Sequence, residues 1–135
     1  YAYCPADTPF RLKNADLPPL SYPEMHTAAD ALCGTHDFTS FTSDKTPGKS
    51  HMRRIDSITV DTVTLPSGIE LLRFTFCGNG FLYNMVRILS GTLLSVGLGQ
   101  IPAAQIPAII EGKSRPLAGP TLPPCGLFLT DVTYL

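Results

Sequence analysis

Residues 78–99, with the sequence GNGFLYNMVRILSGTLLSVGLG, decide the fold of this 135-residue chain. The stretch is too long for a strand and is apolar on nearly all sides, which predicts a central buried helix that opens after 78–80. A membrane span is the alternative, because about 20 apolar residues suffice to cross a bilayer. Arg87 and Asn84 near the middle, and the lack of a basic flank, favour the buried helix.

Arg87 is the single charged residue between Arg73 and Glu111. Arginine is rarely fully buried unless it is paired, and an unpaired buried charge costs several kcal/mol. Arg87 therefore either reaches water or meets an acid that is distant in sequence.

In the expected helix, Tyr83 and Asn84 precede Arg87 by one turn and Gly91 follows it by one turn, so these residues form a polar stripe. Two interpretations stay open. In the first, the guanidinium bonds backbone carbonyls at a subunit or sheet edge. In the second, Arg87 holds a catalytic carboxylate, whose pKa an opposite charge within ~4–6 Å lowers by ~1–3 units.

The flanking sequence predicts an α+β fold, an antiparallel sheet with helices packed on one face. Ile, Val and Thr at 53–65, the turn 66–68 and the segment 69–77 predict a β-hairpin, with a bulge where the alternation slips between Val60 and Val63. Pro23 suits the start of a short helix. The other expected elements are a strand end at 1–4, helices at 23–33 and 102–112, a turn with two aromatic anchors at 36–41 and a closing strand at 126–134. We expect 1–135 to form a single domain.

The composition, 44% hydrophobic and 16% charged with a net charge of −1, is that of an ordinary soluble domain. This balance excludes a protein that grips nucleic acid over its whole surface. The four cysteines lie in no CxxC motif, so we expect reduced thiols, no metal and a cytoplasmic location. The chain begins without Met at a strand-like Tyr1, which predicts a piece of a longer protein, with a trimmed complete fold as the alternative.

Other polar groups are weaker candidates. His36 and Asp37 resemble an acid–base pair, but adjacent residues rarely face one site and Asp in a turn usually caps the backbone. His26 and His51 are expected on the surface. One cationic group comprises Lys45, Lys49, His51, Arg53 and Arg54. We expect these side chains either to contact RNA phosphates or to lie on a loop that is merely solvated. The proline-rich segment 115–125 is either a lid or a simple crossover.

The chain resembles the C-terminal half of the catalytic domain in the bacterial tRNA pseudouridine synthase A family. The order, spacing and type of residues agree over nearly the whole chain. Four blocks carry the resemblance: GTHDFTSF at 34–41, Arg54 with Ile58, NGFLYNMVR at 79–87 with Gly91, and AGPT at 118–121 followed by a closing Gly126-Leu127 segment with Leu129, Val132 and Tyr134.

The resemblance implies half of a pseudouridine synthase fold and an enzyme that isomerises uridine in the anticodon stem-loop of tRNA. The family's essential Asp lies in an Arg-Thr-Asp motif of the N-terminal half, and that motif is absent from this chain. Arg87 would then be the partner of an Asp outside the chain. Tyr1 would stack on the target base or assist proton movement at C5, and Leu127 would line the pocket with Asn84 as a further substrate-binding residue.

The resemblance also implies tRNA and the N-terminal half of the same protein as partners, a homodimer, no cofactor and no membrane association. We expect the 135 residues alone to be inactive, because half of the site is absent. A non-catalytic RNA-binding or dimerisation module that reuses this half-fold is the alternative from another functional class. A small membrane-associated helical protein is a third.

Overall fold

The computed structural model describes residues 2–4, 21–43, 48, 50–64, 66, 70–121 and 128–131. One layer is a five-stranded sheet of order β2-β3-β4-β1-β5, in which every neighbouring pair is antiparallel. The strands are β1 (Ala2–Cys4), β2 (Gly34–Asp37), β3 (Met52–Thr64), β4 (Glu70–Gly78) and β5 (Phe128–Asp131).

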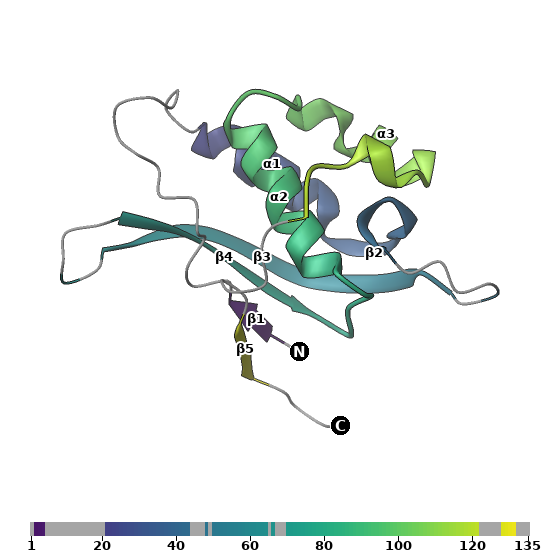
Figure 1. Cartoon of the computed structure of the whole chain (residues 1–135), viewed down its shortest axis with the longest axis horizontal. Coiled ribbons are helices and arrows are strands. Elements are labelled where there is room, and N and C mark those ends of the chain that lie inside the picture. The colour runs from purple at the N-terminus through teal and green to yellow at the C-terminus, as the bar shows by residue number, and fades with distance from the viewer. Residues whose placement is uncertain are drawn as a thin grey trace.

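The helices form a second layer on one side of β3 and β4 (Figure 1). They are α1 (Tyr22–Leu32), α2 (Met85–Gly97) and α3 (Ile106–Gly112), with short 3-10 turns η1 (Thr39–Phe41), η2 (Ala103–Gln105) and η3 (Arg115–Leu117). The predicted α+β class and antiparallel sheet are therefore confirmed. Within the described residues, none of the helices has the length and apolar character needed to cross a bilayer.

The β3–β4 hairpin supplies the floor of the core. Ile58 pairs with Phe76 and Val60 with Phe74, and both phenylalanines are buried beneath the helices. The register shift lies between Ile55 and Ser57, and the ladder then runs regularly to Thr64. The bulge predicted between Val60 and Val63 is thus misplaced, because the extra residue enters before Ile58 and moves the buried positions from odd to even numbers.

The central helix is shorter than the sequence predicts. α2 begins at Met85, whereas 79–84 form a non-helical approach with positive φ at Gly80 and Asn84. All its residues except Arg87 are buried, which agrees with an apolar pattern on every side. α1 packs Met25, Ala28 and Leu32 into the same core.

The predicted turn at 36–41 is partly wrong. Residues 34–37 form β2, whose backbone pairs with β3 from Gly34 opposite Ile55 to Asp37 opposite Met52. The η1 turn follows, and Phe38 and Phe41 are fully buried, as expected for the two aromatic anchors. The strand has no apolar alternation because its side chains lie at the sheet edge.

Candidate active site

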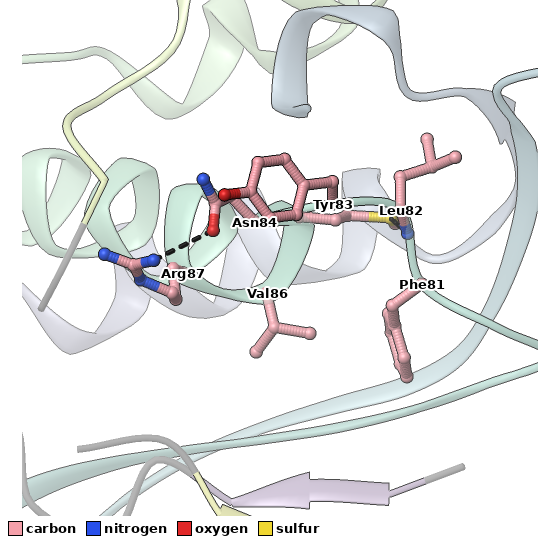
Figure 2. Close-up of a pocket in the computed structure, with 7 residues that line it drawn as sticks. Phe81, Leu82, Tyr83, Asn84, Val86 and Arg87 are labelled. Carbon is pink, nitrogen blue, oxygen red and sulfur yellow. Dashed lines mark hydrogen bonds between the residues drawn. The ribbon is translucent and has the colours of Figure 1, made fainter. Parts of the chain in front are cut away.

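A small pocket of about 250 Å³ lies at the N-terminal end of α2. One continuous segment, Phe81 to Arg87, lines it. Phe81 and Val86 point towards the sheet, and Arg87 extends from the opposite end of the segment beside Asn84 (Figure 2). The volume is below the ~300–1,000 Å³ of typical small-ligand pockets.

The backbone before α2 determines which side chains reach the pocket. The Met85 N–H donates to the Leu82 carbonyl (3.0 Å), and the Ile88 N–H donates to the Asn84 carbonyl (2.9 Å). Asn84 has φ 59°, a left-handed conformation that asparagine tolerates better than most residues. Tyr83 and Asn84 therefore form the turn before the helix, and the expectation that they lie within the helix, one turn before Arg87, is wrong.

Arg87 and Asn84 are nevertheless in contact. The Arg87 Nη1 donates to the Asn84 Oδ1 at 2.8 Å, and the arginine side chain is half-buried. At its other end, the Asn84 Nδ2 donates to the Ser43 Oγ at 3.3 Å. The guanidinium thus has a fixed neighbour from the turn before its own helix, and that neighbour is a side-chain amide oxygen.

Residues 42–43 contact the same turn, and they begin the segment 42–51 with Lys45 and Lys49, here called the basic loop. The Tyr83 carbonyl accepts hydrogen bonds from the Thr42 Oγ1 (2.9 Å) and the Ser43 N–H (3.2 Å). These bonds place residues 42–43 against the pocket and hold Tyr83 while its side chain remains 66% exposed. The sequence pattern did not predict this contact of Thr42 and Ser43 with the pocket segment, because about 40 positions separate them from Tyr83.

The two described arginines of the cationic group have different surroundings. Arg53 donates to the Ser50 and Met52 carbonyls and lies beside Gly80, where an added Cβ would be 3.9 Å from the Arg53 Nε. Arg54 makes an exposed ion pair with Asp56 (2.9 Å). Because adjacent strand residues point to opposite faces, these two arginines do not form one continuous patch. Lys45, Lys49, Tyr1 and Leu127 lie outside the described residues.

Gly91, one turn after Arg87, belongs to a packing contact. A Cβ at Gly91 would lie 1.8 Å from the Pro120 carbonyl oxygen, and a Cβ at Gly119 would lie 2.7 Å from the Thr92 Cα. The Gly119 N–H donates to the Thr92 Oγ1 (2.9 Å). Gly91 is therefore not part of a polar stripe, and the two glycines permit close approach of the chain after η3 to α2.

Arg115 fixes the same segment from the other side. Its guanidinium donates to the Gly119 carbonyl (2.8 Å) and to the Thr121 Oγ1 (3.0 Å). Residues 115–121 are thus held against α2, which favours the simple crossover over the lid for this part of the segment. Residues 122–125 lie outside the described residues. An isolated glycine within a helical pattern was the sequence signal for this close approach.

His36 and Asp37 do not form an acid–base pair. The His36 Nε2 is 2.8 Å from the Cys33 carbonyl, whereas the Asp37 Oδ1 accepts from the Thr39 N–H at 3.1 Å, as a backbone cap does. The Thr39 hydroxyl also donates to Asp37, and this bond is the main reason that the pKa of Asp37 lies below its usual value.

His51 is not the exposed histidine that the sequence predicts. Its Nδ1 lies 3.0 Å from the Thr39 Oγ1, and its Nε2 is buried with no hydrogen-bond partner among the described residues. His26 is exposed, as expected. Within the described ranges, no three His, Cys, Asp or Glu side chains lie together as a metal site.

Comparison with known proteins identifies the family. The model of the family described as tRNA pseudouridine synthase matches residues 28–135. This chain belongs to that family. It is 46% identical over 110 residues to the tRNA pseudouridine synthases A of Streptococcus pyogenes serotype M49 (strain NZ131), serotype M1 and serotype M18 (strain MGAS8232). In each case the match covers 82% of this chain and 43% of the relative, so the chain spans less than half the length of these relatives.

Membership of the tRNA pseudouridine synthase family confirms the resemblance drawn from the sequence blocks. The matched region includes the pocket segment, α2 and the segment at 118–121. The pocket therefore lies in a part of the chain that carries the family relationship. The individual roles of Arg87, Asn84, Tyr1 and Leu127 stay predictions.

Proposed function

We propose that this chain supplies the arginine side of the active site in a tRNA pseudouridine synthase that acts on uridines of the anticodon stem-loop. The observation that carries the proposal is the position of Arg87. Its half-buried side chain lines the pocket, and the pocket segment lies within the region that the family model matches. Its Asn84 contact gives the guanidinium a defined orientation (2.8 Å). A planar, oriented guanidinium is suited to hold a carboxylate by two parallel bonds.

The reaction is an isomerisation, so its atoms balance without a second substrate. The C1′–N1 glycosidic bond of uridine breaks, the uracil rotates, and a C1′–C5 bond forms. The proton on C5 is lost and N1 gains one. A nucleophilic carboxylate must remain ionised for this chemistry, and a nearby arginine favours the ionised form. The target base must also leave its stack and meet an aromatic surface.

The nucleophile in this proposal is an Asp outside the 135 residues, because the chain contains no Arg-Thr-Asp sequence. Tyr1 is the candidate for stacking on the uracil, and Leu127 is the candidate for contact with the uridine. Phosphates of the tRNA would meet Lys45, Lys49, Arg53 and Arg54. We further propose that the enzyme works as a cytoplasmic homodimer without a cofactor, and that the 135 residues alone do not turn over.

The test uses the product of the complete gene and measures pseudouridine formed in tRNA by mass spectrometry. Arg87→Ala should reduce turnover by at least ~1,000-fold, because the carboxylate loses its charge partner, and should change the tRNA dissociation constant less than about 3-fold. Arg87→Lys should restore little, since an ammonium lacks the planar fork. The matched control is Arg73→Lys, which alters an arginine paired with Asp61 on the strand ladder.

Near-normal turnover by Arg87→Ala would refute the role of Arg87. Pseudouridine formation by the 135 residues alone would refute the external nucleophile. A non-catalytic RNA-binding or dimerisation module is the second candidate, and it predicts tRNA binding or self-association with no pseudouridine from the complete gene product.

A further inference from the structure

We propose that Asn84 is a positioning residue that orients the Arg87 guanidinium and fixes it to the start of the basic loop. This inference rests on the proposed function, since it gives Asn84 a role that acts through Arg87. The expectation from the sequence was that Asn84 contacts the substrate. The structure favours the indirect role because both ends of the amide are engaged within the protein.

The two hydrogen bonds define the orientation of the amide. The Arg87 Nη1 can only donate, so the atom that faces it at 2.8 Å must be the Asn84 oxygen. The amide nitrogen then points to the Ser43 Oγ, which accepts at 3.3 Å. Ser43, Asn84 and Arg87 therefore form a chain of contacts that joins two parts of the sequence 41 residues apart.

The backbone of Asn84 supports the same role. Its φ of 59° turns the chain sharply before α2, and its carbonyl accepts the first hydrogen bond of the helix from Ile88. Asn84 therefore lies at the bend between the Tyr83 carbonyl, which holds residues 42–43, and the first turn of α2, which carries Arg87. A movement of the loop start would be transmitted to the guanidinium through this residue.

Two substitutions separate orientation from simple structural support. Asn84→Gly keeps the left-handed backbone but removes both side-chain contacts. Asn84→Asp keeps the shape and the left-handed tolerance, because the Ser43 hydroxyl can donate to a carboxylate, but it adds a negative charge beside Arg87. A role confined to the backbone turn predicts that both variants behave like the wild type.

In the complete gene product, we expect Asn84→Gly to lower kcat by about 10- to 100-fold, the range for a catalytic group misplaced by about 1 Å. KM for tRNA should change less than about 3-fold. Asn84→Asp should lower kcat at least as much, since its carboxylate competes with the nucleophile for Arg87. In an Arg87→Lys background, Asn84→Gly should have at most a small further effect, because residues that act together are non-additive.

Arg87 reactivity gives a readout that does not depend on turnover. Phenylglyoxal modifies arginine, and peptide mass spectrometry locates the modified residue. Modification of Arg87 should be several-fold faster in Asn84→Gly and unchanged in Asn84→Asp, where the guanidinium is still held. Arg54, exposed and paired with Asp56, is the internal control and should react equally in all variants.

The outcomes distinguish a positioning role of Asn84 from direct contact with the substrate. A fall in kcat together with faster Arg87 modification supports the positioning role. In Asn84→Gly, a fall in kcat with unchanged Arg87 modification overturns it in favour of direct substrate contact, and an unchanged kcat overturns it whatever the modification rate. If the wild type forms no pseudouridine, the proposed function fails, and the modification rates alone decide whether Asn84 orients Arg87.

Discussion

Gly91→Ala tests the contact between α2 and the segment at 118–121. The new methyl carbon would lie 1.8 Å from the Pro120 carbonyl oxygen and 2.9 Å from its carbonyl carbon. Ordinary carbon contacts are ~3.5 Å or longer, so the segment must move by more than about 1.5 Å. Both atoms belong to the backbone, and no side-chain rotation can relieve the overlap.

The expected cost follows from three contributions. Overpacking costs about 1–3 kcal/mol, and displacement of Gly119 endangers its hydrogen bond to Thr92, worth about 1 kcal/mol. Alanine in a helix regains about 1 kcal/mol relative to glycine. The free energy of unfolding should therefore fall by about 2 kcal/mol, which lowers Tm by about 5–10 °C for a domain of this size.

The assay is urea unfolding followed by circular dichroism, with thermal melts as a second measure. Gly112→Ala at the end of α3 is the matched control, because its Cβ would meet only the side chain of Leu117, which is exposed and can rotate away. That variant should be within about 0.5 kcal/mol of the wild type. Equal stability of Gly91→Ala and the wild type would refute the close packing of this segment on α2.

Two further predictions concern the η1 region. Ser40→Ala should lose about 2 kcal/mol of unfolding free energy in denaturant titration, because the buried Ser40 hydroxyl donates to the Ile109 carbonyl (2.7 Å) and accepts from the Ser114 N–H (2.8 Å). The control Ser90→Ala removes only a buried bond to a helical carbonyl and should be nearly neutral. Equal losses in the two variants would contradict the stabilising role of the Ser40 bonds. The pKa of Asp37 is lowered in the folded state, so its stabilisation is present above about pH 4 and is lost as pH falls through the folded pKa. In acid unfolding titrations, the wild-type advantage over Asp37→Asn, at most about 1 kcal/mol, should therefore shrink as the pH falls, and an advantage independent of pH would contradict the shift.

Periodicity predicted the elements whose side chains alternate between core and solvent. The hairpin, α1 and the buried helix were all found, and the lone charge of Arg87 directed attention to the pocket. The first residue of α2 was missed because Phe81 and Leu82 extend the apolar run of the helix towards its N-terminus. Hydrophobicity does not encode the left-handed φ of Asn84, which ends the approach and starts the helix.

Tertiary contacts account for the other misses. β2 lacks a strand pattern, since its backbone bonds to β3 hold it rather than an apolar face. Ser43 and Thr42 contact the pocket segment through bonds to a turn about 40 residues away. The sequence around His51 is polar and basic, and the structure alone shows its hydrogen-bond contact with the Thr39 hydroxyl and the burial of its Nε2.

The position of β1 has a consequence for the order of folding. This three-residue strand pairs with Phe76 and Cys77 of β4 on one side and with β5 at Phe128–Asp131 on the other. Closing the β1–β5 loop costs about 2–3 kcal/mol more chain entropy than closing the β3–β4 turn. During synthesis, the hairpin and α2 can therefore form while β1 still waits for its second partner. The β1–β5 pair can form only after the residues of β5 have left the ribosome, so it joins segments whose translation is separated by that of the other described elements.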